Sequence, residues 1–293
     1  MLSVNDIIKQ AMFIAVDIGA TNTRVAGFSS ETPDSLLTVE KIAASQEYGE
    51  FYTNLVTLIK QVSKGEPIEK ISIGSTGLVS PDKTMLIRCA FLPALANKPF
   101  VTSLSSDFHT EVILNNDAMC SAMGESYFGV GRNGTRILYI TISTGMGGAF
   151  VKKDHDTAYI MPAEIGHTIV DLHGKICECG QKGCIGAYAH GRGLEERFLM
   201  KPENIDDIRV WEEVAEYLTI GVINGARIFM PDTIVFSGAI VEAREYVLQK
   251  IKQLYEKRSV IRPMPELVKS QFGDNSVLYG ALAFLSSNHI VYI

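Results

Sequence analysis

The stretch FIAVDIGATNTRVAGFS, residues 13–29, decides the fold. Its first half is an apolar run that ends in an aspartate and a glycine, and its second half returns to apolar residues after a short polar turn. This pattern predicts a β-hairpin. A second stretch, RILYITISTGMGGAFV at residues 136–151, predicts another hairpin with glycines at its turn. Because the pattern occurs twice, we expect two similar lobes with a cleft between them.

Outside the hairpins, predicted strands alternate with predicted helices. The strands are expected at residues 70–80, 111–117 and 233–240, and the helices at 50–65, 117–129, 207–230, 242–258 and 275–286. This alternation predicts an α/β fold. We expect a small N-terminal lobe over residues 1–117 and a larger C-terminal lobe over 118–280. A C-terminal helix at about 281–293 is expected to pack back on the first lobe, and a single large α/β domain is the alternative.

Composition and charge exclude several classes of protein. The 27 lysines and arginines are outnumbered by 33 acidic residues and form no basic stripe, so we expect no nucleic-acid partner. No apolar run reaches the roughly 18–20 residues of a membrane span, so we expect no membrane partner. The first residues lack the basic start and the cleavage site of a signal peptide. We therefore expect a cytoplasmic protein.

Three turns follow predicted strands and are rich in glycine, serine and threonine. They lie at residues 17–24, 142–148 and 236–240. Such turns can direct backbone N–H groups at phosphate oxygens, so three of them suggest a nucleoside triphosphate. In the first turn Gly19 allows close approach, Thr21, Asn22 and Thr23 offer donors, and Asp17 could hold a metal ion through water. A plain β-turn is the alternative there. Neither GxxxxGK[ST] nor GxGxxG is present, which disfavours the two commonest nucleotide motifs.

The segment LNNDAM, residues 114–119, ends a predicted strand and opens a predicted helix. Asp117 at this junction suits two roles. It could cap the helix through its carboxylate. It could also act as a general base near a sugar hydroxyl, because carboxyl ends of strands are common ligand positions.

A histidine and three cysteines have the spacing of a metal site. His167, Cys177, Cys179 and Cys184 follow the pattern His–x9–Cys–x–Cys–x4–Cys. Three thiolates and one imidazole match a closed tetrahedral Zn²⁺ site, which would be structural because the protein fills every position. His173 and His190 are alternative nitrogen ligands, and free buried thiols are the competing interpretation. With five cysteines and no export signal, a disulfide framework is unexpected.

These motifs together resemble the ROK family of sugar kinases and related repressors. The matching segments are VDIGATNTRVAGF, IGSTGLVSPDK, LNNDAMCSAMGE, ITISTGMGGAFV and EIGHTIVD…CECGQKGC, and they span nearly the whole chain. The resemblance implies a two-lobed fold like that of actin and hexokinase (ribonuclease H-like), with an interlobe cleft and a structural zinc site. It also implies ATP-dependent phosphorylation of a hexose with Mg²⁺, on glucose or an N-acetylated hexosamine such as N-acetylmannosamine, at the 6-hydroxyl.

The resemblance also assigns roles to residues. Asp117 would take the proton from the attacking hydroxyl. The sugar would be bound by Gly77, Asn116, Asp117, Glu164 and His167. The nucleotide site would be formed by Asp17, Gly19, Thr21, Asn22, Thr23, Thr144, Gly145, Gly147, Gly148 and Gly238. Members are expected to be homodimers or homotetramers.

Two alternatives stay within the same family. A sugar-responsive repressor is disfavoured, because only about a dozen residues precede the first predicted strand and a winged-helix domain needs more. A sugar-binding member with weakened catalysis is suggested by one departure from the family pattern. The family usually carries Glu two residues after the last zinc cysteine, where it contacts hydroxyls near the anomeric carbon. This chain has Gly186 there, and Tyr188 or His190 could substitute.

Overall fold

The computed structural model describes residues 11–287 and 289–293. These residues fall into two compact units. The first unit comprises the chain up to Gly124 together with Val277–Ser287. The second unit comprises Glu125–Ser276 and the C-terminal residues that follow Ser287. The lobe bounds expected from the sequence stay a prediction.

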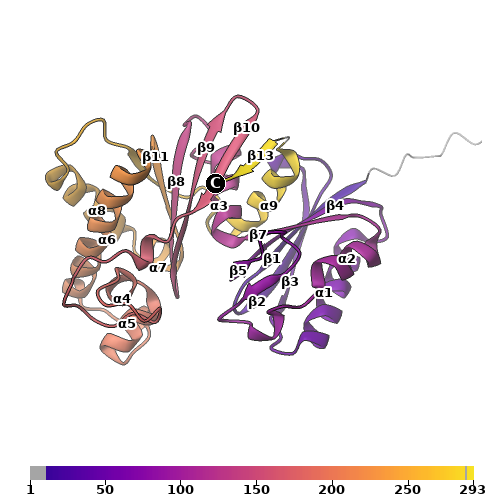
Figure 1. Cartoon of the computed structure of the whole chain (residues 1–293), viewed down its shortest axis with the longest axis horizontal. Helices are drawn as coiled ribbons and strands as arrows, with labels where there is room; N and C mark the ends of the chain where they lie inside the picture. The colour runs from indigo at the N-terminus through magenta and orange to yellow at the C-terminus, as the bar shows by residue number, and fades with distance from the viewer. Residues whose placement is uncertain (1–10, 288) are drawn as a thin grey trace, which may run out of the picture. The chain divides into compact units, whose positions relative to one another are not determined.

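The first unit is built on a five-stranded mixed sheet with the order β3-β2-β1-β4-β7 (Figure 1). Its strands are β1 (Met12–Ile18), β2 (Asn22–Phe28), β3 (Leu36–Ala43), β4 (Ile68–Ser75) and β7 (Glu111–Asn116). The first three strands form an antiparallel meander, and β4 and β7 continue the sheet parallel to β1. A short antiparallel pair, β5 (Leu78–Val79) and β6 (Leu86–Arg88), follows β4.

Helices cover this sheet because their apolar faces match its buried side chains. Helix α1 (Tyr48–Ser63) buries Phe51, Leu55 and Ile59 against the strands, and α2 (Phe100–Phe108) belongs to the same core. On the other side, α9 (Ser276–Ser286) packs through Tyr279 on Phe28 of β2, with ring centroids 5.9 Å apart. Burial of Phe28 and Phe51 stabilises the unit by about 1.5–3 kcal/mol each.

The second unit repeats this strand order. Its six-stranded sheet runs β12-β11-β8-β9-β10-β13. The strands are β8 (Arg136–Ile142), β9 (Met146–Asp154), β10 (Thr157–Pro162), β11 (Thr233–Ser237), β12 (Glu266–Lys269) and β13 (His289–Tyr292). Again three strands form an antiparallel meander, β8 to β10, and two more, β11 and β12, continue parallel to its first strand.

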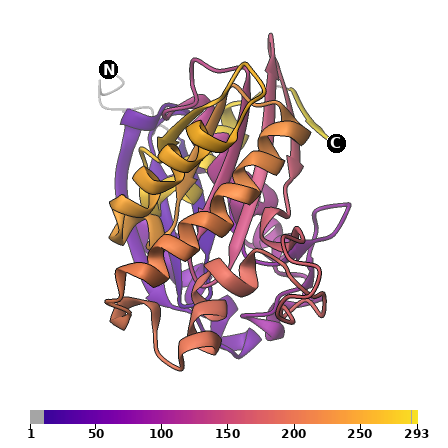
Figure 2. The ribbon, with the colours of Figure 1, turned by 90° about the vertical axis from the view of Figure 1, so that its left-hand side faces the viewer.

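Two long helices cover the second sheet. Helix α6 (Ile208–Phe229) and α8 (Glu245–Arg258) lie side by side across its face (Figure 2). Trp211 of α6 is 1% exposed, and its indole N–H donates to the carbonyl of Ile205 at 2.8 Å. The shorter helices of this unit are α4 (Gly186–Ala189), α5 (Gly191–Phe198) and α7 (Ala239–Ala243).

Helix α3 (Asp117–Tyr127) begins in the first unit and ends in the second. The second-unit part begins at Glu125, which is fully buried. Its carboxylate accepts hydrogen bonds from the Ser270 hydroxyl at 2.5 Å and from the N–H groups of Phe272 and Val130 at 3.0 and 3.2 Å. These bonds satisfy a charge that would be costly to bury alone.

Most expected elements are confirmed, including both hairpins and the helices α1, α3 and α6. Two expectations are wrong. The expected C-terminal helix at 281–293 ends at Ser286, and the chain then forms β13, which pairs parallel with β10. The single helix expected at 242–258 begins earlier as α7 and breaks at Arg244, whose backbone is not helical.

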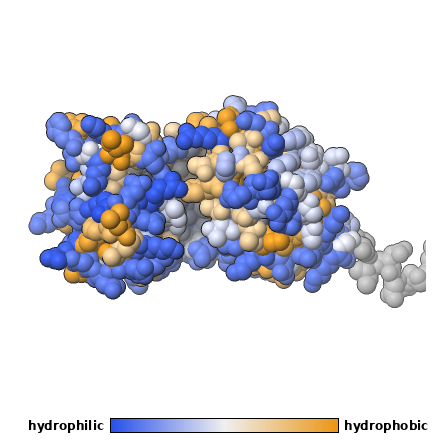
Figure 3. All heavy atoms as spheres, turned by 90° about the horizontal axis from the view of Figure 1, so that it is seen from below, coloured by the Kyte–Doolittle hydropathy of each residue, from blue (hydrophilic) through white to orange (hydrophobic). Residues whose placement is uncertain are grey.

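Within the two described ranges, no helix combines the length and apolar character needed to cross a bilayer. Figure 3 shows a mainly hydrophilic face, with hydrophobic side chains in separate small patches.

Candidate active site

The carboxyl ends of three parallel strands meet at one edge of the first sheet. In register, Ile18 of β1 pairs with Ser75 of β4, and Ser75 pairs with Asn116 of β7. This edge therefore holds the turn after β1, the loop with Gly77 and the start of α3. The Asn116 side-chain amide donates to the Gly77 carbonyl at 3.3 Å. The first unit thus brings together Gly77, Asn116 and Asp117, as a common site would require.

Asp117 is the first residue of α3 and is half-buried. Its Oδ1 accepts from its neighbour Ala118 N at 2.8 Å. Helix capping is shared with Asn116, whose Oδ1 accepts from Ala118 N at 3.0 Å and Met119 N at 3.3 Å. Burial raises the pKa of Asp117 to about 6, and the negative charge of Asp17 acts in the same direction. A carboxylate with this pKa is ionised at neutral pH and is a stronger proton acceptor than an ordinary aspartate.

Asp17 has a partner that the sequence analysis missed. Asp17 and Arg24 are directly opposite in the β1–β2 hairpin. Arg24 donates from Nε and Nη2 to Oδ2 of Asp17, at 2.9 and 2.5 Å. Asp17 is only 6% exposed, so this ion pair compensates a largely buried charge. The sequence held a signal for this ion pair, because Asp17 and Arg24 carry opposite charges at positions that face each other in the expected hairpin.

The turn of this hairpin presents backbone and small polar groups. Thr21 and Asn22 are exposed, and Gly19 N donates to the Asn22 carbonyl at 3.0 Å. Thr23 differs, because it is 2% exposed and its hydroxyl lies inside the unit. The structure therefore leaves Gly19, Thr21 and Asn22 at the surface of the turn and takes the Thr23 side chain away from it.

A second missed residue is Lys83, in the turn between β5 and β6. It is partly buried, and its Nζ donates to Oδ1 of Asn115 at 2.7 Å. Burial lowers the pKa of Lys83 to about 8. Because Asn115 precedes Asn116 and Asp117 in the chain, this bond fastens the loop after β4 to the strand that carries the candidate base.

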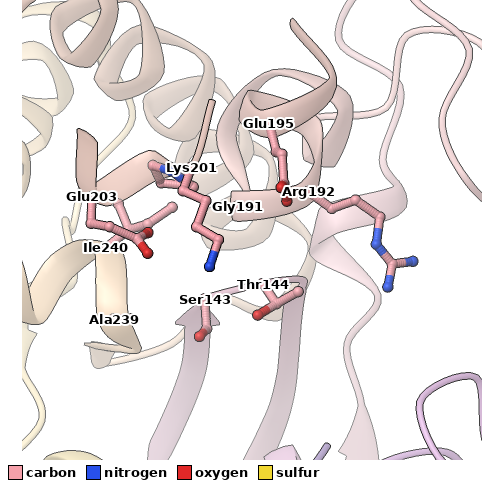
Figure 4. A pocket seen from close by; sticks show the side chains of 10 residues that line it. Ser143, Thr144, Gly191, Arg192, Glu195, Lys201, Glu203, Ala239 and Ile240 are labelled. Carbon is pink, nitrogen blue, oxygen red and sulfur yellow. The ribbon is translucent and has the colours of Figure 1, made fainter. Parts of the chain in front are cut away.

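In the second unit, a pocket lies beside the turn between β8 and β9 (Figure 4). It is lined by Ser143, Thr144, Gly191, Arg192, Glu195, Lys201, Pro202, Glu203, Ala239 and Ile240. Helix α5 is fastened to this turn, because Gly191 N donates to Ser143 O at 2.7 Å and Arg192 N donates to Thr144 O at 2.9 Å. In Figure 4 the Lys201 ammonium points toward the Ser143–Thr144 turn.

The expected glycines of this unit serve different purposes. Gly238 has φ +98°, and a Cβ there would lie 2.4 Å from the Ile142 carbonyl. At Gly148 a Cβ would lie 2.7 Å from the Tyr139 carbonyl. Both positions therefore require glycine for close packing. Gly147 pairs with Thr141 inside the hairpin, whereas Gly145 has open space around it and is accessible to a ligand.

The structure brings His167 together with Cys177, Cys179 and Cys184. Their nitrogen and sulfur ligand atoms all lie within 4.8 Å of one another. The Sγ atoms of Cys179 and Cys184 are 3.7 Å apart, and Cys177 Sγ is 3.6 Å from His167 Nδ1. Tetrahedral zinc with ordinary bond lengths separates two sulfurs by about 3.8 Å, and a sulfur and a nitrogen by about 3.6 Å. The donor set and these two separations therefore fit a zinc ion.

The same geometry defines the orientation of His167. Its Nδ1 faces the cysteines, so its Nε2 lies on the opposite side of the ring. His167 ends a short 3-10 helix, Ile165–His167, and Glu164 is exposed immediately before that helix. The second unit thus holds Glu164 and His167 near one another, with the cysteine cluster behind the imidazole.

The ROK family model matches residues 13–288. Glucokinase of Streptomyces coelicolor is 24% identical, with 92% of this chain and 95% of the relative aligned. A xylose repressor of Caldicellulosiruptor bescii is 25% identical over 85% of this chain and 72% of its own length. The crystal structure of a ROK family glucokinase from Streptomyces griseus with glucose and AMPPNP has TM-score 0.77 and 23% identity, covering 94% of this chain and 99% of that one.

The solved neighbour shows a shared α/β fold, in which two mixed sheets carry helices on their faces. The family model covers almost the whole chain. The chain belongs to the ROK family.

Proposed function

We propose that this chain is an ATP-dependent hexose kinase that transfers the γ-phosphate to a sugar hydroxyl, at O6 in the expected case. The observation that carries the proposal is Asp117. In a chain of the ROK family, it stands at the carboxyl end of β7 with its pKa raised to about 6. The substrate is glucose or an N-acetylated hexosamine such as N-acetylmannosamine.

Asp117 accepts the proton of the attacking hydroxyl in this proposal. Asn116, Gly77, Glu164 and His167 orient the sugar, and His167 uses the nitrogen that faces away from the cysteines. Phosphoryl transfer depends mainly on alignment and charge stabilisation, so a modestly basic carboxylate is sufficient. Mg²⁺ would arrive with ATP and neutralise phosphate charge.

We assign the nucleotide to the pocket beside the β8–β9 turn. Gly145 leaves room at the turn, Lys201 offers a positive charge, and Ala239 and Ile240 offer a small apolar wall. In the first unit, the exposed turn with Gly19, Thr21 and Asn22 supplies further phosphate contacts. The positive charge of Arg24 already compensates the negative charge of Asp17. We therefore propose that Asp17 contacts the metal ion only through a water molecule.

We assign one structural zinc ion to His167, Cys177, Cys179 and Cys184, whose donor atoms are grouped closely enough to hold it. The ion would lock the imidazole of His167 in one orientation and leave Nε2 free to contact the sugar. Its role is support, since all four positions are taken by protein.

The proposal is tested by a coupled assay of ATP consumption over a panel of hexoses. The panel contains glucose, fructose, allose, N-acetylglucosamine and N-acetylmannosamine. We expect turnover with at least one sugar and loss of that turnover in Asp117→Asn. No turnover with any sugar, together with measurable sugar binding, would favour a weakened sugar-binding member instead.

A regulatory role is the second candidate, because a xylose repressor is among the relatives. A gel-shift assay with random duplex DNA at low salt distinguishes it, and we expect no complex for a chain of net charge −6. We also expect a cytoplasmic protein that forms a homodimer or homotetramer, which light scattering would measure.

A further inference from the structure

The space that a side chain at position 186 would occupy is filled by His190. A Cβ built on Gly186 would lie 2.5 Å from Cδ2 and 2.7 Å from Nε2 of the His190 imidazole. The next nearest atom, at 3.1 Å, is the carbonyl oxygen of Gly166, the residue before His167. The His190 ring therefore lies where the family's glutamate side chain would begin, next to the backbone that leads into His167.

Tyr188 is the other residue that could substitute for the missing glutamate, but its side chain is bound to other groups. Its hydroxyl accepts from Lys175 N at 2.9 Å and lies 3.3 Å from Oδ2 of Asp171. Its ring stacks on Tyr217 with centroids 4.1 Å apart. These contacts hold the Tyr188 side chain against the loop that carries the cysteines and against α6, so of the two substitutes only His190 fills the space at Gly186.

The hydrogen bonds of His190 define which nitrogen carries its proton. Nδ1 accepts from Gly193 N at 3.0 Å, so in the neutral ring the proton is on Nε2. Burial lowers the pKa of His190, which favours this neutral form. Position 190 therefore presents an N–H donor, whereas a glutamate at 186 would present an acceptor.

This donor has no hydrogen-bond partner among the described residues. His190 is 3% exposed, and Nε2 is covered. The carboxylate oxygen Oε1 of Glu178 lies 3.9 Å from Nε2, which is too far for a hydrogen bond. Glu178 itself is ion-paired with Arg192, and 31% of its side chain is exposed. A buried donor left unpaired is unfavourable, and a ligand acceptor that takes the place of Glu178 beside Nε2 would relieve this cost.

We propose that His190 is a sugar-selectivity residue, which replaces the missing carboxylate at 186 and donates from Nε2 to a hydrogen-bond acceptor on the sugar. This inference rests on the proposed kinase function. The acceptor that fits best is the carbonyl oxygen of an acetamido group, because it accepts strongly and has no proton to give. A glucose hydroxyl is a weaker hydrogen-bond acceptor than an acetamido carbonyl. In this chain it also lacks the glutamate carboxylate to which it would have donated a hydrogen bond. The enzyme therefore prefers an N-acetylated hexosamine to glucose.

The test compares three variants with the wild type. His190→Ala removes the donor. Gly186→Glu combined with His190→Ala restores the carboxylate, and the second substitution removes the ring with which a side chain at 186 would collide. His155→Ala is the matched control, because that imidazole lies in an exposed turn with 96% of its side chain accessible. Each variant is checked for an unfolding temperature within about 5 °C of the wild type, so that a loss of folding is not mistaken for a change in selectivity.

We measure kcat/KM for N-acetylmannosamine, N-acetylglucosamine and glucose, the KM for ATP, and sugar binding by calorimetry without nucleotide. In His190→Ala we expect kcat/KM for the preferred N-acetylated sugar to fall about 10-fold and that for glucose to fall less than about 3-fold. The double variant should raise the glucose value relative to the N-acetylated sugars. The KM for ATP and the control should stay unchanged.

Equal losses for all three sugars, or an unchanged ranking in both variants, would overturn the inference while leaving the kinase function intact. A wild-type chain that phosphorylates no hexose would overturn the proposed function. In that case calorimetry decides, because the inference still requires a selective loss of N-acetylated sugar binding in His190→Ala. Absence of binding to all three sugars would overturn the inference as well.

Discussion

Arg24 binds Asp17 across the first hairpin, with Nη2 2.5 Å from Oδ2. The consequence extends to Asp117, whose pKa is raised by burial and by the charge of Asp17. Arg24 therefore limits how much negative charge faces the candidate base. The pair also stabilises the hairpin that begins the first sheet.

Arg24→Ala should weaken folding and shift the pH dependence of catalysis. Removing one partner of a buried ion pair costs about 3–5 kcal/mol, and the partial exposure of Arg24 places the expected loss at the lower end. Without the positive charge of Arg24 beside it, Asp17 should raise the pKa of Asp117 further, so the acidic limb of the rate profile should move to higher pH. Urea unfolding and a pH–rate profile measure the two effects. The double variant Asp17→Asn/Arg24→Ala should recover part of the stability, and an Arg24→Ala protein with unchanged stability and profile would contradict this role.

Asp117→Asn should abolish phosphorylation while sugar binding persists. We expect kcat to fall at least 100-fold, within the range attributed to general-base catalysis. In the wild type, kcat should decline as pH falls through about 6, because the base becomes protonated there. A variant that turns over at close to the wild-type rate would rule out Asp117 as the base.

The same substitution should stabilise the protein at neutral pH. The folded pKa of Asp117, about 6, lies above its ordinary value of 3.8. The folded state therefore binds the proton of Asp117 more tightly than the unfolded state does, which stabilises the fold. This contribution to the free energy of unfolding is fully present below pH 3.8 and is lost as pH rises through 6. Asparagine resembles the protonated form, so the variant's advantage in unfolding temperature should be small at pH 4 and should grow up to about pH 7. An advantage that does not vary with pH would argue against the raised pKa.

Metal analysis should find about one zinc per chain. Cys184→Ser should reduce the zinc content and lower the unfolding temperature, because a structural zinc contributes directly to folding. Cys89→Ser is the control, since Cys89 is a buried cysteine of the first unit and outside the cluster. A wild-type protein that is folded, active and free of zinc would refute the assignment.

Ala239→Trp should impair nucleotide binding selectively. The side chain of Ala239 is exposed in the pocket beside the β8–β9 turn, and an indole there would fill the space (Figure 4). We expect the KM for ATP to rise about 10-fold or more, with sugar affinity unchanged in calorimetry. Gln249→Trp, on an exposed position of α8, is the control. A KM for ATP within twofold of the wild type would place the nucleotide elsewhere.

Local patterns predicted much of this structure. The hairpins, α1 and α6 were predictable because apolar periodicity and turn residues act within one segment. The cysteine cluster was predictable because its three thiols lie within eight residues, from Cys177 to Cys184. The strand β13 was missed because its pairing partner, β10, lies far away in sequence. Strand formation at a sheet edge depends on that partner more than on the segment itself.

Hydrogen bonds and contacts between side chains were less predictable, because they too depend on segments that are distant in the sequence. The distance between Lys83 and Asn115 depends on how the loop after β4 returns to β7. The position of His190 over Gly186 depends on the break between α4 and α5, where His190 leaves the helical conformation. Sequence spacing could name His190 as a candidate, but it could not say that its ring fills the space of the missing side chain.

The two units share one strand order but differ in the chemistry we assign to them. Asp117 belongs to the first unit, and Gly186 and His190 belong to the second. The proposed determinants of sugar preference therefore lie in a different compact unit from the proposed proton acceptor. An evolving ROK lineage can exchange residues around position 186 and acquire a new substrate without altering the unit that carries its base.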